Sequence, residues 1–246
     1  MPENTITRIA MWSGPRNIST AMMRAWENRA DTFVTDEPFY AFYLAASGID
    51  HPGKEEIITS QSTDWRQVAR ECTTQTNRDC RVHYQKHMTQ HMLPQLDLDW
   101  INALHNIFLI RTPQEVVASY SKTRPDLTPQ DLGFEQQHRL FMHVREYCDD
   151  HPLVIRAIDV LKNPTAMLTA ICDKCNLAFD QSMLKWPAGK RDSDGVWAPH
   201  WYHNVEQSTE FSAPAKRDIT LNAKQQSIAD QCEPFYAALR EHTFTL

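Results

Sequence analysis

The chain has 246 residues, with 25 Lys and Arg against 31 Asp and Glu, so its formal net charge is −6 at neutral pH. Apolar residues make up 41% of it, which is typical of a globular protein and too many for a disordered chain. The acidic balance argues against a dedicated nucleic-acid binder, because such proteins usually carry a basic surface. The length fits one large α/β domain, and we expect a single domain over residues 1–246.

Several features bear on the compartment. No stretch approaches the roughly 18 apolar residues that a membrane span needs, and residues 1–4 have neither the basic nor the apolar part of a secretory leader. Six cysteines in a chain of this length do not make a disulfide scaffold. The close pair Cys172 and Cys175 lies in a helical pattern without a second pair at zinc-site spacing. We therefore expect a cytoplasmic protein, a monomer or homodimer, with no metal and no membrane or nucleic-acid partner.

Predicted strands and helices alternate along the chain. Strands are expected over residues 7–13, 32–36, 80–85, 106–111 and 153–158, because these runs are apolar or alternate and end in turn signals. Helices are expected over residues 19–29, 64–76, 128–150 and 222–242, and two more are expected to begin at residues 112 and 163. Thr112-Pro113-Gln114-Glu115 has the pattern of a capping box with Pro at the first helical position.

This alternation predicts a three-layer α/β fold. A central parallel sheet of about five strands would have helices on both faces. Residues 46–62 and 187–214 do not fit the alternation, and we expect irregular segments there that act as functional loops or lids of a binding site.

The first strand leads into a loop suited to phosphate. In open α/β sheets ligands bind beyond the carboxyl ends of the strands. Residues 13–20, SGPRNIST, would join a strand to a helix N-terminus, whose free N–H groups attract anions. Arg16 adds a permanent cation, and Ser19 and Thr20 add hydroxyls. The spacing is close to a Walker A loop but lacks its Gly-Lys pair. An ordinary helix start capped by Ser or Asn is the alternative.

A second basic position follows the fourth strand. Arg111 ends an apolar run, where a charge is costly unless it meets an anion. Ser119 follows eight residues later. An Arg that simply emerges from the sheet into water is the alternative.

Together these segments resemble the sulfotransferases that use 3′-phosphoadenosine 5′-phosphosulfate (PAPS). Residues 15–20, PRNIST, are similar to the family's 5′-phosphosulfate loop. Residues 107–120, IFLIRTPQEVVASY, are similar to its 3′-phosphate segment, and residues 158–164, IDVLKNP, to the start of a late family helix. The resemblance runs from about residue 7 to residue 177, although Asn17-Ile18 replaces the usual Ser-Gly and Ala21 stands where a Trp is common.

The resemblance implies a P-loop NTPase-like fold and transfer of a sulfuryl group from PAPS, without a metal, to a hydroxyl of a small soluble acceptor. It implies that Arg16 also stabilises the leaving phosphate. Residues expected to bind the donor are Arg16, Asn17, Ile18, Ser19, Thr20, Arg111 and Ser119, with Lys190 and Arg191 as a weaker counterpart of the family's C-terminal basic segment.

The acceptor hydroxyl needs a general base. Glu37 follows the second strand, where many carbohydrate and tyrosyl-protein sulfotransferases place a catalytic Glu. His87, with Lys86 beside it, resembles the Lys-Thr-His segment of cytosolic members. Both are preferred to His83 and His91, and the choice between Glu37 and His87 stays open.

An aromatic cluster is expected over the acceptor pocket. It consists of Trp197, His200, Trp201 and Tyr202. Such walls suit a cationic alcohol, a phenol or a sugar hydroxyl, and core packing is the alternative.

Two other functions remain as alternatives. One is an ATP-dependent P-loop-like small-molecule kinase, which the absent Gly-Lys pair disfavours. The other is a nucleotide-binding protein without catalysis.

Overall fold

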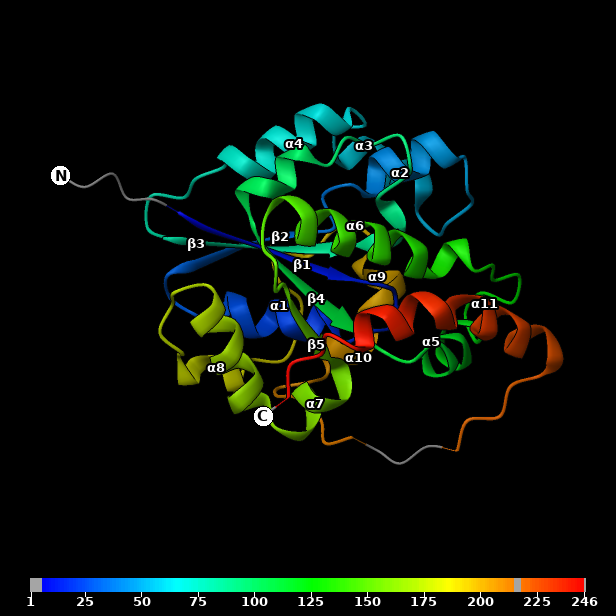
Figure 1. The fold of residues 1–246 in the computed structure, drawn as a ribbon. Helices are drawn as coiled ribbons and strands as arrows, with labels where there is room; N and C mark the ends of the chain where they lie inside the picture. Colours follow the sequence, from blue (N-terminus) through cyan, green and yellow to red (C-terminus); the bar gives the residue numbers. More distant parts are fainter. Residues whose placement is uncertain (1–5, 215–217, 246) are drawn as a thin grey trace.

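The centre of the protein is a five-stranded parallel sheet, seen in a computed structural model that describes residues 6–214 and 218–245 (Figure 1). The strand order is β2-β3-β1-β4-β5, and every neighbouring pair is parallel. The strands are β1 (Thr7–Ser13), β2 (Thr32–Asp36), β3 (Val82–Met88), β4 (His105–Ile110) and β5 (Leu153–Arg156). The predicted α/β fold is confirmed. Residues 1–4, on which the leader prediction rests, lie outside the described ranges.

The central strand β1 is apolar on both faces of the sheet from Ile9 to Trp12. In β1, Ile9 and Met11 join one core cluster, and Ala10 and Trp12 join the other. Because successive residues of a strand point to opposite faces, a continuous apolar run forms a layer between two cores. Figure 1 shows helices above and below this layer, as a three-layer fold requires.

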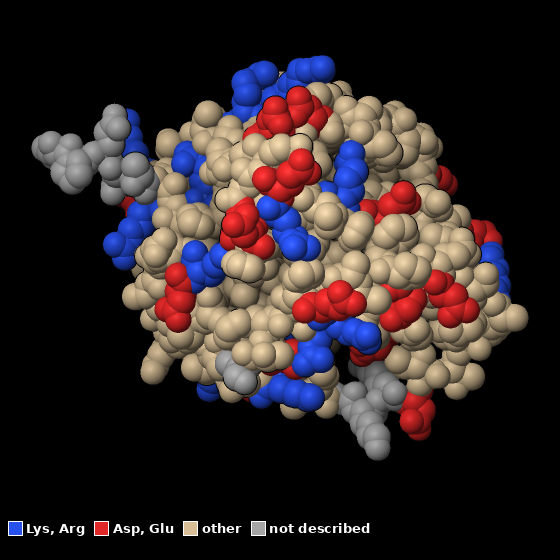
Figure 2. Space-filling view, in the orientation of Figure 1, with Lys and Arg blue, Asp and Glu red and all other residues tan. Residues whose placement is uncertain are grey.

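Helices on each face complete the cores. The first core takes in α1 (Ser19–Glu27), α7 (Ala157–Lys162) and α8 (Pro164–Lys174). The second takes in α4 (Trp65–Thr74), α5 (Pro113–Tyr120), α6 (Phe134–Tyr147) and α11 (Ala223–Arg240). Among the helices of the described ranges, none is long and apolar enough to cross a membrane. Figure 2 shows Lys and Arg mixed with Asp and Glu on the face drawn.

The expected ends of two strands were wrong by two residues or more. β3 ends at Met88 rather than at residue 85, so Lys86 and His87 lie inside the strand instead of after it. β5 ends at Arg156, and the residues predicted to continue it form α7. Both errors come from the ends of elements, where an apolar run alone does not separate a strand from the helix or turn beside it.

The two segments predicted to be irregular contain short helices. Residues 46–62 include the end of α2 (Tyr40–Ser47) and all of α3 (Lys54–Ser60), so that prediction was wrong. Two acidic residues in the first turn of α3 favour its start, and Ile57 is its buried anchor. Residues 187–214 hold only the one-turn helices α9 (Ala198–Trp201) and α10 (His203–Glu206).

A glycine separates two elements where one long helix was predicted. The stretch from residue 128 forms a 3₁₀ turn, Gln130–Leu132, and α6 begins only after Gly133. Gly133 has φ +69°, and a Cβ there would lie 2.5 Å from Thr89 Oγ1 and 2.6 Å from the backbone N of Gln90. Gly133 therefore lets α6 pack directly on the 3₁₀ turn Thr89–His91, which follows β3.

Replacing Gly133 with Ala tests this close packing. We expect Gly133→Ala to lower the free energy of unfolding by about 2–5 kcal/mol, because left-handed strain and overlap with Gln90 add together. The matched control is Gly48→Ala, where φ is +70° and a Cβ would meet nothing within 4 Å. Gly48→Ala should lower the free energy of unfolding by about 1 kcal/mol, because only the left-handed strain acts there. Urea unfolding of both variants measures the difference, and equal losses would contradict the account.

Candidate active site

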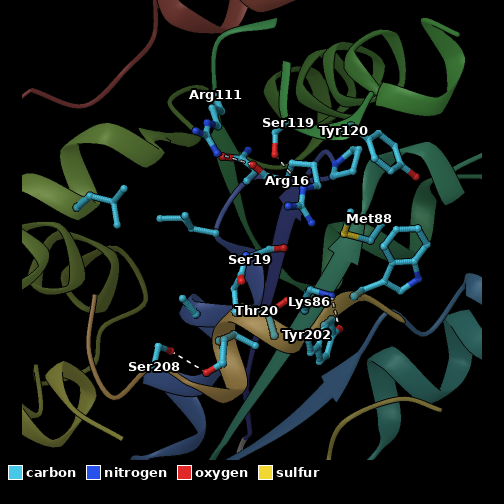
Figure 3. A pocket seen from close by; sticks show the side chains of 18 of the residues that line it. Arg16, Ser19, Thr20, Lys86, Met88, Arg111, Ser119, Tyr120, Tyr202 and Ser208 are labelled. Atoms are coloured by element: carbon cyan, nitrogen blue, oxygen red, sulfur yellow. Dashed lines mark hydrogen bonds between the residues drawn. The ribbon is translucent and has the colours of Figure 1, made fainter. Parts of the chain in front are cut away.

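A cavity of about 530 Å³ lies at the carboxyl ends of the strands. Its lining comes from the loop after β1, the ends of β2 and β3, the segment after β4, and residues 201–214. Figure 3 shows Arg16, Arg111 and Ser119 grouped in one part of it, with Lys86 and Tyr202 in another. This is the position at which parallel α/β sheets bind ligands.

The loop after β1 is held in an unusual backbone conformation. Arg16 has φ +59° and Ile18 has φ +50°, both in the left-handed region that non-glycine residues rarely adopt. Asn17 fixes the loop, because its Nδ2 donates to the carbonyl of Leu109 in β4 at 2.6 Å. Alternating backbone conformations of this kind turn successive N–H groups into a concavity that binds anions.

The start of α1 adds to this anion site. Ile18 is the N-cap residue and makes no side-chain cap, so the expected alternative of a Ser or Asn cap was wrong. The N–H groups of the first turn therefore have no side-chain acceptor among the described residues. Ser19 and Thr20 line the cavity there (Figure 3). Free N–H groups and the positive end of the helix dipole both favour a phosphate or sulfate.

Two arginines meet at the second basic position. Arg111 donates from Nη1 to the carbonyl of Arg16 at 2.8 Å, and Arg16 donates from Nε to Ser119 Oγ at 3.0 Å (Figure 3). Burial lowers the pKa of Arg16, and the charge of Arg111 lowers it further. The Arg111 guanidinium also meets Glu115 Oε1 at 3.3 Å, which offsets part of the charge. Two cations and a hydroxyl at a cavity wall form a site for an anion.

Thr112 does not cap the helix that begins beside Arg111. Its side chain makes no hydrogen bond to the backbone of α5, and its hydroxyl donates to Glu115 Oε2 at 2.7 Å. The predicted capping box was therefore wrong in its hydrogen bonds, although Pro113 does begin the helix. The pair Thr112–Glu115 instead orients the carboxylate toward Arg111.

A buried lysine organises the other part of the cavity. Lys86 in β3 lies directly opposite Asp36 in β2, and its Nζ donates to Asp36 Oδ1 at 2.9 Å. The same Nζ donates to Glu37 Oε1 and to the hydroxyl of Tyr202, the latter at 2.8 Å. All three N–H bonds of the ammonium are thereby used. Burial opposes the charge of Lys86, but Asp36 and Glu37 outweigh it and raise its pKa.

The two neighbouring carboxylates differ in their surroundings. Asp36 also accepts from the hydroxyl of Tyr202 at 2.6 Å and from the backbone N of Gly195 at 3.1 Å. Glu37 has φ +41° and lines the cavity. Burial raises the pKa of Glu37; Lys86 works against this and Asp36 adds to it. The carboxylate of Glu37 therefore binds a proton more readily than an exposed glutamate does.

A protein-family model described as a sulfotransferase domain matches residues 7–243. The chain belongs to the sulfotransferase family. Two relatives from Arabidopsis thaliana, branched-chain-amino-acid aminotransferase-like proteins 2 and 1, are each 32% identical over 234 residues, or 95% of this chain. The chain spans 41% and 42% of the length of these relatives.

Solved structures share the fold. The sulfotransferase domain from the Curacin biosynthetic pathway is 17% identical, has a TM-score of 0.53, and covers 93% of this chain and 98% of its own. The sulfotransferase domain from the Synechococcus PCC 7002 olefin synthase is 16% identical and has a TM-score of 0.60. It covers 100% of this chain and 98% of its own.

His87 lies outside the cavity of this sulfotransferase. Because Lys86 and His87 are successive residues of one strand, they point to opposite faces of the sheet. The His87 ring stacks on Trp12, its partner across the strands, at 4.3 Å, and its Nε2 hydrogen-bonds to Gln85 Oε1 at 3.0 Å. The expectation that His87 stands beside the acceptor was wrong, since the strand was predicted to end too early.

The predicted aromatic cluster is divided between cavity and core. Trp201 and Tyr202 line the cavity, whereas Trp197 is buried and donates from Nε1 to the Tyr202 hydroxyl at 3.1 Å. His200 packs against Gly53, so it contacts α3 rather than the cavity. For Trp197 and His200 the expected contact with the acceptor was therefore wrong.

The predicted C-terminal basic pair also lies elsewhere. Neither Lys190 nor Arg191 is among the described residues that line the cavity. Arg191 Nε lies 3.7 Å from Glu27 Oε2, at the end of α1. The structure therefore uses Arg191 to hold the segment 187–214 against α1.

Several polar and aromatic cavity residues were not expected there. They include Tyr40, His51, Gln90 and Tyr120, together with His91, which was only a less preferred candidate base. Gln90 and His91 follow β3 at its carboxyl end, so a correct strand end would have indicated them. The other three come from α2, α5 and the segment between α2 and α3, whose approach depends on tertiary packing.

The burial of His87 predicts a pH dependence of stability. Burial lowers the pKa of His87 to about 3, with smaller contributions from His83 and Lys86. Between pH 6 and pH 4 the unfolded chain binds a proton at His87 and the folded chain does not, so this residue makes stability fall as the pH falls. The contribution is about 1.4 kcal/mol per pH unit.

His87→Phe tests this, because Phe keeps a ring on Trp12. Urea titrations at pH 6 and pH 5 give the loss of unfolding free energy on acidification for each protein. This loss should be about 1.4 kcal/mol smaller in the variant than in the wild type. Equal losses in the two proteins would show that His87 is protonated in the folded state.

Proposed function

We propose that this sulfotransferase moves a sulfuryl group from PAPS to a hydroxyl of a small-molecule acceptor. The observation that carries the proposal is the adjacency of two anion sites in one cavity with a buried carboxylate. PAPS has a 3′-phosphate and a 5′-phosphosulfate on one ribose, so its binding requires two neighbouring anion sites. Arg16 joins them here, since its backbone follows the loop and its side chain reaches Ser119.

Each site suits one end of the donor. Arg111 and Ser119 would bind the 3′-phosphate, which distinguishes PAPS from ATP. The loop of residues 15–20 and the first turn of α1 would bind the 5′-phosphosulfate and the charge that develops on the leaving phosphate. Charge-assisted hydrogen bonds of this kind contribute roughly 1.5–3 kcal/mol each.

Glu37 is the proposed general base. Its carboxylate lines the cavity, and its raised pKa makes it a stronger base than an exposed carboxylate. Arg16 and Lys86 would balance negative charge around the transferred group. His87 is not proposed, because its ring packs on the opposite face of the sheet.

The alternatives have less support. A kinase would need a lysine in the first loop, where this chain has Arg16-Asn17-Ile18. The name of the plant relatives refers to amino-group transfer, but the chain matches only about two fifths of those proteins. A nucleotide-binding protein without catalysis predicts donor binding without transfer to any acceptor.

Thermal denaturation tests the donor site. Adenosine 3′,5′-bisphosphate should raise the melting temperature by several degrees at about 100 times its dissociation constant, where mass action contributes about 2.7 kcal/mol. ATP with magnesium at the same concentration should raise it less. Arg111→Ala should abolish the preference, whereas Arg66→Ala, which removes an arginine stacked on Trp65, should retain it. An equal response to both nucleotides would contradict the 3′-phosphate site.

Glu37→Gln tests the base. We expect kcat to fall by about 10²–10⁴-fold, because Gln keeps the shape but accepts no proton. Affinity for adenosine 3′,5′-bisphosphate should stay unchanged in calorimetry. Since the base must be ionised and its pKa is raised, wild-type activity should be lost as the pH falls through a value above the ordinary pKa of Glu. Transfer of radiolabelled sulfur from PAPS measures this, and wild-type rates in the variant would exclude Glu37.

A further inference from the structure

Two atoms on the acceptor side of the cavity take no part in the proposed donor site. Glu37 Oε2 and His91 Nε2 are 3.9 Å apart, and both residues line the cavity. This distance is too long for a direct hydrogen bond. A single oxygen atom can nevertheless lie about 2.8 Å from both. One hydroxyl group beside the pair can therefore hydrogen-bond to both atoms.

The two oxygens of Glu37 have different tasks. Oε1 accepts from Lys86, which fixes the carboxylate. Oε2 receives no hydrogen bond from the residues that the structure describes, and the side chain keeps 10% exposure. The free oxygen is thus the one directed at His91, and it is available to a ligand.

His91 is held rigidly beside that oxygen. It ends the 3₁₀ turn Thr89–His91, which Thr89 ties to Gly133 by a hydrogen bond of 2.9 Å. Its ring stacks on Tyr40 at 4.6 Å and on Tyr43 at 4.8 Å. Stacking on two rings sets the direction of Nε2 without using either ring nitrogen.

His91 is suited to donate rather than to take the proton. Burial lowers its pKa well below the usual value, and His51, Lys86 and His87 add to this. A neutral imidazole has one N–H donor. Because His91 is a weak base here, Glu37 and not His91 receives the proton of a hydroxyl bound between them.

We propose that the acceptor hydroxyl binds between Glu37 Oε2 and His91 Nε2, and that His91 is a second catalytic residue that selects hydroxyls over amines. The proposal rests on the proposed sulfuryl transfer. His91 Nε2–H donates to one lone pair of the acceptor oxygen, and the oxygen donates its hydrogen to Glu37 Oε2. The second lone pair forms the bond to sulfur. The bond from sulfur to the 5′-phosphate oxygen breaks, its electrons leave with adenosine 3′,5′-bisphosphate, and the proton stays on Glu37.

The selection follows from counting lone pairs. A hydroxyl oxygen has two, so it accepts from His91 and still attacks sulfur. A neutral amine nitrogen has one, and a hydrogen bond from His91 occupies it. The site therefore takes the class of alcohol and phenol acceptors and excludes amines.

Two variants separate this role from simple packing. His91→Phe keeps a ring on Tyr40 and Tyr43 but removes the donor, whereas His91→Gln removes the ring and keeps an N–H donor. The probe is radiolabelled PAPS with water as the oxygen acceptor, read as release of labelled sulfate. We expect a loss of roughly tenfold in His91→Phe, the equivalent of one hydrogen bond, and recovery to within about threefold in His91→Gln.

Binding and a matched control complete the experiment. Affinity for adenosine 3′,5′-bisphosphate and the melting temperature should be unchanged in His91→Phe. His143→Phe, a substitution in α6 outside the cavity lining, should leave the rate unchanged. A wild-type rate in His91→Phe, with or without a loss in His91→Gln, would overturn the assignment. Absence of labelled release from the wild type, together with no preference for adenosine 3′,5′-bisphosphate over ATP, would instead reject the proposed function, on which the assignment rests.

Discussion

One buried ammonium group determines the arrangement of the acceptor side of the cavity. Removing an ion from water costs several kcal/mol, so Lys86 is tolerated in the core only if every N–H bond finds an acceptor. Asp36, Glu37 and Tyr202 supply these acceptors. Tyr202 belongs to a segment 116 residues away in the chain. The need to satisfy one cation therefore joins β2, β3 and residues 187–214.

This requirement also explains the difference between the two adjacent carboxylates. Asp36 is engaged by Lys86, Tyr202 and Gly195, and it is a structural acceptor. Glu37 accepts from Lys86 with Oε1 only, and its Oε2 lies near His91, which lines the cavity. Arg16 and Arg111 lie together on another wall of the cavity, which is therefore positively charged. A cavity with separated basic and acidic ends suits an anionic donor and an acceptor that must lose a proton.

Much of this arrangement could be predicted from residues close together in sequence. The loop of residues 13–20 and the pair Arg111 and Ser119 each combine a strand end with a helix start, and the three-layer fold follows from the same alternation. The end of β3 was misplaced by three residues, and this error assigned His87 to the wrong face. The contacts of Lys86 with Tyr202 and of Arg191 with Glu27 join distant segments, so no local pattern indicates them.

The central claim is that one ligand with two phosphate groups joins the two basic sites. A crystal structure of the protein with adenosine 3′,5′-bisphosphate tests it most directly. The account predicts the 3′-phosphate on Arg111 and Ser119, and the 5′-phosphate on the backbone of residues 15–20 at the start of α1. A nucleotide bound with its phosphates away from both positions, or reversed between them, would contradict it.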